Sequence, residues 1–218
     1  TKVVEDVLGK GMRAAVNFPF ASSFARDYLE QWLREGVIGT PERVDIELAF
    51  ETWPRSWQMS ASSWLDGRAE VGFTREVGSH FLFLSRRFFG LLQLVSAECE
   101  YPEAGRSERE IRAELKAGET PVSMIGGVGT TEKDDHNTWT ITGSKGRIRL
   151  RDWSIAEREV DGDWQAPPDA VPNVKARPMI LKRQLDKVDA MTRGEAHNLA
   201  TLGEALEVQG IVERILEA

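Results

Sequence analysis

The sequence contains very little cysteine: Cys99 is the only one among 218 residues. A lone cysteine excludes an internal disulfide, and it also excludes a zinc site built from several thiolates. This usage is typical of a reducing compartment and favours the cytoplasm.

Long hydrophobic runs and an excess of positive charge are missing as well. The most apolar stretch, HFLFLSRRFFGLLQLV, is interrupted by Arg86 and Arg87, too early for a membrane span of roughly 20 residues, and no signal peptide is visible. The net charge is −7, whereas nucleic acids and anionic membranes attract clustered Lys and Arg. We therefore expect neither a nucleic acid nor a membrane as a partner.

Several common functional motifs are incomplete. Gly127 and Gly129 lack the third glycine and the helical pattern of a dinucleotide fingerprint. Ser79 lacks the context of a nucleophile elbow. The run from Asp134 to His136 has the residue types of a metal site but no partner motif, so a solvated turn is the better interpretation. His197, at the start of the last predicted helix, is interpreted as a structural or capping-region residue.

The composition is that of a folded globular protein, with 41% hydrophobic and 29% charged residues. The length suits one large domain, or one domain with part of another. The chain opens without methionine on what reads as the end of a helix, followed over 11–20 by a short apolar strand and a proline turn. We therefore expect further residues before Thr1.

Hydrophobic spacing predicts the remaining elements. Helices are expected over 21–36, 75–89, 175–194 and 195–218, and strands over 43–51, 91–101 and 120–129, with hairpins over 136–153 and 155–165. In 91–101, Val95, Ala97, Cys99 and Tyr101 should share one face. The highly charged segment 106–119 is expected to be a solvated excursion or lid. Because most sheet connections are hairpins, the pattern predicts an α+β fold, an open and mostly antiparallel sheet with helices on one face.

The segment GFTREVGSHFLFL, residues 72–84, is the main candidate site. In the helix over 75–89, Glu76 lies one turn before His80, so the two side chains can meet. A carboxylate beside an imidazole raises the histidine pKa and orients the ring, which suits a general acid or base. Gly78 between them would allow a ligand or another backbone to approach. The alternative is a partly buried helix whose histidine and glutamate are only structural, since such a pair arises easily by chance.

Four segments in order resemble the C-terminal domain of the Gfo/Idh/MocA (glucose–fructose oxidoreductase/inositol dehydrogenase) family. The segment from NFPF to GTPERVDIEL is similar to that family's N-x-R-F-x-P…G-x-I-G pattern, and REVGSH to its D-x-G-x-H helix. WTITGSKGRIRL is similar to its glycine hairpin, and HNLATLGEALEVQGIVERIL to its closing helix. The resemblance covers nearly the whole chain. It implies a dihydrodipicolinate-reductase-like C-terminal domain over 20–218, preceded over 1–19 by the end of a truncated Rossmann nucleotide-binding domain.

The resemblance also implies roles for particular residues. His80 matches the catalytic histidine, and Glu76 stands where the family usually has aspartate, one methylene shorter. Asn17 matches the asparagine of the first motif, as a substrate-binding and possible cofactor-binding residue. Arg75 is also predicted to bind substrate. The arginine that the family places beside Phe18 is absent, so the substrate need not be the usual sugar or inositol.

Tryptophans supply further candidates. Trp53 and Trp64 lie in the irregular stretch before the candidate helix and are predicted to line a substrate cleft, whereas Trp139 fits the apolar face of the sheet. No metal site is predicted.

The resulting hypothesis is that this chain is the substrate-binding and oligomerisation part of an NAD(P)-dependent oxidoreductase, and that it is inactive without the N-terminal nucleotide-binding domain. The cofactor, NAD or NADP, would be held mainly by the absent N-terminal domain. A homodimer or homotetramer through the sheet face is expected. Two alternatives remain open: a family member that binds a ligand or partner without efficient chemistry, and a free-standing α+β binding or scaffold module.

Overall fold

The computed structural model describes residues 2–218, which form one open eight-stranded sheet with helices. The strands lie in the order β2-β3-β4-β1-β5-β6-β7-β8, and every neighbouring pair is antiparallel except β1 and β4. The predicted α+β class and mostly antiparallel sheet are confirmed. The strands are β1 Pro41–Phe50, β2 Leu92–Glu100, β3 Glu110–Ala117, β4 Thr120–Val128, β5 Asp135–Gly143, β6 Gly146–Arg151, β7 Ile155–Val160 and β8 Asp163–Gln165.

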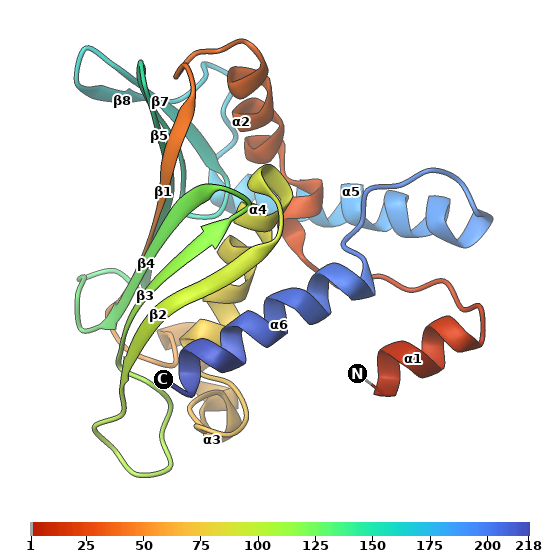
Figure 1. The fold of residues 1–218 in the computed structure, drawn as a ribbon, viewed down its shortest axis with the longest axis vertical. Helices are drawn as coiled ribbons and strands as arrows, with labels where there is room; N and C mark the ends of the chain where they lie inside the picture. Colours follow the sequence, from red (N-terminus) through yellow and green to blue (C-terminus); the bar gives the residue numbers. More distant parts are fainter. Residues whose placement is uncertain (1) are drawn as a thin grey trace.

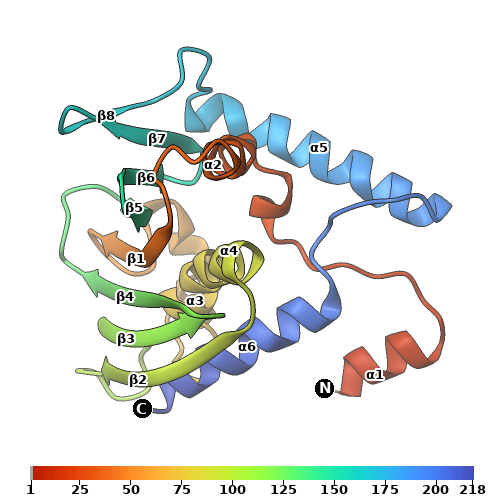
Figure 2. The ribbon, with the colours of Figure 1, turned by 45° about the horizontal axis from the view of Figure 1, so that its top comes forward.

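The helices gather on one face of this sheet. They are α1 Lys2–Gly9, α2 Phe24–Arg34, α3 Ser62–Leu65, α4 Ser79–Phe89, α5 Asn173–Arg193 and α6 Leu202–Leu216, with 3-10 turns at Pro19–Ser22 and Ser56–Ala61. Figure 1 shows α2, α4 and α6 beside the sheet, with the opposite face of the sheet open and α1 lying apart from the body. In Figure 2, α4 lies between α2 and α6.

The core lies between the centre of the sheet and α4. Alternate residues of β1, from Val44 to Phe50, are buried in this core, as the spacing predicts. Trp139 of β5 is wholly buried, and its indole Nε1–H donates to Ser85 Oγ of α4 over 2.8 Å. A buried indole needs such a partner, so this bond fixes α4 against the central strands.

The charged segment 106–119 is not a solvated lid: most of it is β3, an internal strand between β2 and β4. Charged side chains alternate there with Ile111, Ala113, Leu115 and Ala117, all buried. Two of these four buried residues are alanines, which are small, so the apolar face of the strand is hard to recognise among the charged residues. The alternation of apolar and charged residues every second position nevertheless indicates a strand.

Other boundaries also differ from the prediction. Val95 is 63% exposed because the β2–β3 register shifts between Leu94 and Ser96, which turns it to the opposite face from Ala97 and Cys99. Segment 11–20 contributes one isolated bridge, from Val16 to Ala200, rather than a strand.

The closing helix starts later than expected. It begins at Leu202 instead of at 195, because Thr201 and Glu204 form a capping box that fixes its first turn. None of the helices in residues 2–218 is both long and apolar enough to cross a membrane.

Candidate functional site

The predicted helix over 75–89 exists, but its first turn is wider than an α-helix. Thr74–Gly78 form a π-helical turn that runs directly into α4. π-turns inside helices are frequent at functional sites. At Gly78, an added Cβ would lie 2.5 Å from the Met124 methyl carbon and 3.5 Å from Leu48. Gly78 therefore lets the core pack closely, and it does not serve the close approach of a ligand that its position suggested.

His80 occupies an aromatic cage at the start of α4. Its ring lies edge-on to Phe18, Phe20 and Trp153, with centroid distances of 5.2, 6.2 and 5.4 Å. Its buried Nδ1 has no hydrogen-bond partner among the described residues. Burial, and secondarily the charge of Arg55, lowers the pKa of His80 from 6.5 to about 4. The imidazole is therefore neutral at pH 7.

Glu76 does not act on His80 in the way the spacing suggested. Its Oε1 instead accepts from Arg55 Nη2 over 3.4 Å and from Gln58 Nε2 over 3.2 Å. The expectation that Glu76 raises the histidine pKa is wrong, because burial and a guanidinium dominate the surroundings of the ring.

Arg55 is a charged residue at the centre of the candidate site that the sequence analysis does not single out. It is only 3% exposed, and its guanidinium donates to Gln58 over 2.8 Å and to Asp135 over 2.8 Å as well as to Glu76. A buried charge needs such partners. Asp135, one of these partners, is the first residue of β5. It is a counter-ion of Arg55 and not, as the sequence suggested, part of a solvated turn. Among residues 2–218 there is no cluster of three or more His, Cys, Asp or Glu side chains arranged for a metal ion.

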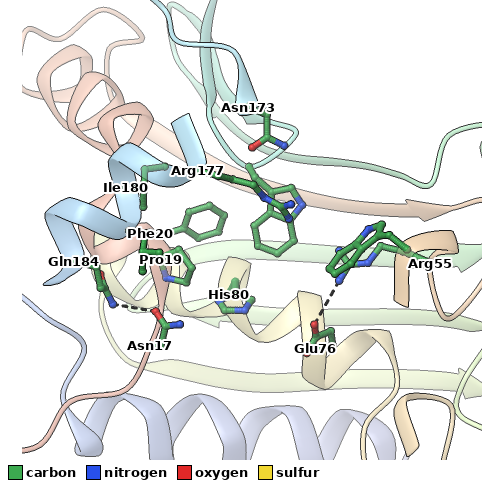
Figure 3. Close-up of a pocket in the computed structure, with 13 residues that line it drawn as sticks. Asn17, Pro19, Phe20, Arg55, Glu76, His80, Asn173, Arg177, Ile180 and Gln184 are labelled. Carbon is green, nitrogen blue, oxygen red and sulfur yellow. Dashed lines mark hydrogen bonds and ion pairs between the residues drawn. The ribbon is translucent and has the colours of Figure 1, made fainter. Parts of the chain in front are cut away.

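A cavity of about 250 Å³ opens in front of His80. Five separate parts of the chain line it: the segment before α2, the start of the 3-10 turn Ser56–Ala61, the π-helical turn with the start of α4, the turn after β6, and α5 from Asn173 to Gln184 (Figure 3). Its polar and charged lining residues are Asn17, Arg55, Glu76, His80, Asn173, Arg177 and Gln184, and its aromatic ones are Phe20, Trp57 and Trp153.

The predicted site residues divide into two groups. Asn17, Glu76 and His80 meet at this cavity. Arg75 points elsewhere, to Glu213 of α6 over 2.6 Å and to two backbone carbonyls. Trp53 is buried against Phe50 and Phe73, and Trp64 is 52% exposed, outside the cavity.

A hydrogen-bond chain orients Asn17. Ser22 Oγ donates to Gln184 Oε1 over 2.5 Å, and Gln184 Nε2 donates to Asn17 Oδ1 over 3.1 Å. The Asn17 oxygen already accepts this bond, whereas its amide N–H groups have no partner among the described residues and can donate to a ligand. Figure 3 shows this pair at one end of the cavity, close to His80.

Replacing Gln184 with methionine is expected to lower the free energy of unfolding by about 1–3 kcal/mol, because the buried Ser22 hydroxyl and the Asn17 carbonyl lose their partner. Urea unfolding measures the effect. The matched control is its neighbour Leu185, which is 57% exposed; Leu185→Gln should stay within about 0.5 kcal/mol of the unchanged protein. If both variants lost the same free energy of unfolding, the hydrogen bonds from Gln184 to Ser22 and Asn17 would not contribute to stability as described.

The buried histidine predicts a pH dependence of stability. With a folded pKa of about 4 against 6.5 for an ordinary histidine, the unfolded state binds more protons between these values. Stability is therefore lost as pH falls from 6.5 towards 4, at up to about 1.4 kcal/mol per pH unit. Urea unfolding at several pH values should show a shallower acid loss for His80→Gln than for the unchanged protein. Parallel curves would argue against a neutral, buried His80.

Comparisons with known proteins agree with this layout. Residues 30–218 match the family described as the oxidoreductase family, C-terminal alpha/beta domain. A search of curated proteins found no match. Among solved structures, an oxidoreductase from Thermotoga maritima is 17% identical with a TM-score of 0.75, and the alignment covers 99% of this chain and 63% of that one.

Two further structures hold nicotinamide cofactors. A 3-ketoreductase from Actinomadura kijaniata, solved with NADP and TDP-benzene, is 16% identical with a TM-score of 0.75 and coverages of 98% and 65%. An oxidoreductase from Agrobacterium radiobacter, solved with NAD+, L-tartaric acid and magnesium, is 15% identical with a TM-score of 0.76 and coverages of 99% and 65%. These likenesses show the fold, and the chain spans 63–65% of the length of these structures. Together with the family match, they place the chain in the Gfo/Idh/MocA oxidoreductase family, as its C-terminal α/β domain.

Proposed function

We propose that this chain is the substrate-binding part of an NAD(P)-dependent oxidoreductase. The parent enzyme would move a hydride to or from a hydroxyl or carbonyl carbon of a sugar-like or other small polyol or cyclic substrate. The observation that carries the proposal is the cavity lined by both His80 and Asn17, together with a His80 ring nitrogen that has no hydrogen-bond partner among the described residues.

His80 would act as the general acid or base at the substrate oxygen. As a neutral imidazole, it can accept the hydroxyl proton when the alcohol is oxidised and return it when the carbonyl is reduced. The N–H groups of Asn17 would orient a neighbouring oxygen. The rings of Phe18, Phe20 and Trp153 hold the imidazole in place and limit its contact with water.

The glycine segment 126–130 does not offer a phosphate cradle for the dinucleotide. The N–H groups of Gly129 and Thr130 both donate to the Phe50 carbonyl, over 2.7 and 3.2 Å, so they are not free to bind phosphate. We therefore propose that NAD or NADP is held by an N-terminal nucleotide-binding domain, of which residues 1–19 are the end, and that residues 20–218 alone are inactive. A bound nicotinamide would supply or accept the hydride.

The open face of the sheet is proposed to bind a second copy of the chain, as a homodimer or homotetramer. Threonines of β5 and the paired charges of β6 and β7, such as Arg149 with Glu157, lie there. Sedimentation analysis of the purified chain tests this: a monomer at all concentrations would contradict it. The cytoplasm is proposed as the compartment, on the single cysteine.

A second candidate is a member of the family that binds a ligand without efficient chemistry. The specific observation in its favour is that Glu76, at the position of the family's aspartate, is engaged by Arg55 and Gln58. Such a carboxylate is less available to a substrate.

Two measurements test the proposal. The intact mass of the protein from its natural source would be near 24.4 kDa for a free-standing module, and larger by a domain of roughly 100 residues or more for the proposed enzyme. The second is the change in NAD(P)H absorbance when that protein is mixed with a panel of polyols and keto sugars. A larger mass with turnover supports the enzyme, whereas ligand binding without turnover favours the second candidate.

A further inference from the structure

Arg177 is a cation at the cavity without a counter-ion. It lies in the second turn of α5 and lines the cavity together with Asn173, the first residue of that helix. Its side chain makes no ion pair or hydrogen bond with the rest of residues 2–218, in contrast to Arg55, whose charge is balanced by Glu76 and Asp135. One positive charge therefore remains available in a chain whose net charge is −7.

The surroundings of Arg177 are suited to an anion. α5 has 21 residues, and the partial positive charge of its first turn lies at the cavity. The residue before it, Pro172, makes no side-chain cap. Figure 3 shows Asn173 and Arg177 on the α5 side of the cavity, facing the side that carries His80 and Glu76.

The same cavity offers flat apolar surfaces for a ring. Trp57 is 57% exposed, and the guanidinium carbons of Arg55 and Arg177 lie 4.8 and 5.6 Å from its ring centroid. Trp153 lines another part of the cavity, in contact with His80. The C–H faces of a sugar ring pack well on indole rings, while amides and guanidinium groups satisfy its oxygens.

We propose that the cavity binds a sugar acid, with the substrate's carboxylate paired to Arg177 and one of its hydroxyls at His80. This deepens the proposed function and rests on it for the role of His80. The planar fork of a single guanidinium matches a carboxylate, which carries one negative charge. A phosphate ester carries up to two charges and would call on a second cation, but the charge of Arg55 is already balanced.

The electrostatics of His80 agree with an anionic ligand. Burial lowers the His80 pKa most, and the positive charge of Arg55 lowers it further. A carboxylate bound in the cavity adds a negative charge near the ring, so binding is expected to move the His80 pKa upwards, towards the value useful for proton transfer at neutral pH.

The test compares D-glucuronate, D-glucose and glucose 6-phosphate as probes of the 218-residue chain, with tryptophan fluorescence and two-dimensional NMR as readouts. Glucuronate should bind at least tenfold more tightly than the other two. Arg177→Gln should reduce glucuronate affinity by about 10- to 100-fold, the usual worth of a hydrogen bond to a charged group, and leave glucose affinity unchanged. Lys175→Gln is the matched control, because it removes the same charge two residues earlier in α5, outside the cavity lining; it should change neither affinity.

Four outcomes would overturn the inference: no binding of glucuronate, equal binding of glucose, tighter binding of glucose 6-phosphate, or equal losses in the Arg177 and Lys175 variants. The proposed function and the sugar-acid inference can be distinguished. His80-dependent turnover of neutral polyols, without glucuronate binding, would support the oxidoreductase function and contradict the sugar-acid inference. Arg177-dependent glucuronate binding by a protein without NAD(P)-linked turnover would support the sugar-acid ligand and contradict the oxidoreductase function.

Discussion

Replacing His80 with alanine is expected to lower turnover by about 10²- to 10⁴-fold in the complete enzyme, the usual contribution of a positioned general acid or base. Ligand affinity should change by only a few-fold, because Asn17 and the aromatic and cationic walls of the cavity remain. The measurements are NAD(P)H-linked kcat for the first and tryptophan fluorescence titration of the ligand for the second.

A second histidine provides the control. His197 is exposed and lies outside the cavity, so His197→Ala should retain both kcat and affinity. If His80→Ala retained kcat, His80 would have no catalytic role and the non-catalytic candidate would be favoured. If it lost ligand affinity as strongly as kcat, the role of His80 would be in binding and not in proton transfer.

Sequence patterns predicted the sheet well wherever large residues supply one face. In β1, Val44, Ile46, Leu48 and Phe50 alternate without interruption, and all are buried. The two hairpins were found because glycine marks their turns, between Gly143 and Gly146 and at Gly162. The signal failed in β3, where alanines supply half of the inward face, and at Val95, where a bulge reverses the alternation.

The candidate site was only partly predictable from the sequence, and the reason is geometric. Glu76 and His80 belong to one helix, so their spacing could be read directly, and the family resemblance supplied Asn17. Arg177 and Gln184 come from α5, about a hundred residues further along the chain, and no local pattern connects them to His80. Only the packing of α5 on the 3-10 turn Pro19–Ser22 brings these residues together.

The clearest error is the prediction that Glu76 contacts His80 and raises its pKa. It shows what residue spacing alone cannot predict. An acid four residues before a histidine can meet it on an α-helix, but the turn at Glu76 is π-helical, and Arg55 from another segment holds the carboxylate. A stronger partner from outside the helix therefore decided where the carboxylate points.

The second large effect is expected in the hairpin between β5 and β6. Gly143→Ala should lower the free energy of unfolding by about 2–4 kcal/mol, from overpacking and from strained hydrogen bonds. An added Cβ at Gly143 would lie 2.5 Å from the Ile38 carbonyl oxygen and 2.9 Å from that of Thr40. These two oxygens already accept from the amides of Lys145 and Ser144, over 2.8 and 3.0 Å. The backbone cannot move away without weakening both bonds.

Gly146 at the other end of the same turn is the matched control for Gly143. No atom lies within 4 Å of a Cβ added there, so Gly146→Ala should change the unfolding free energy by less than about 1 kcal/mol. Urea unfolding of both variants, with the slope and midpoint fitted together, measures the difference. If the two variants were equally stable, segment 38–40 would not pack on the hairpin as described, and the register of β1 against β5 at Pro41 and Gly143 would need revision. Because the hairpin lies outside the cavity lining, a folded Gly143→Ala protein should bind ligand normally, which separates damage to the fold from damage to the site.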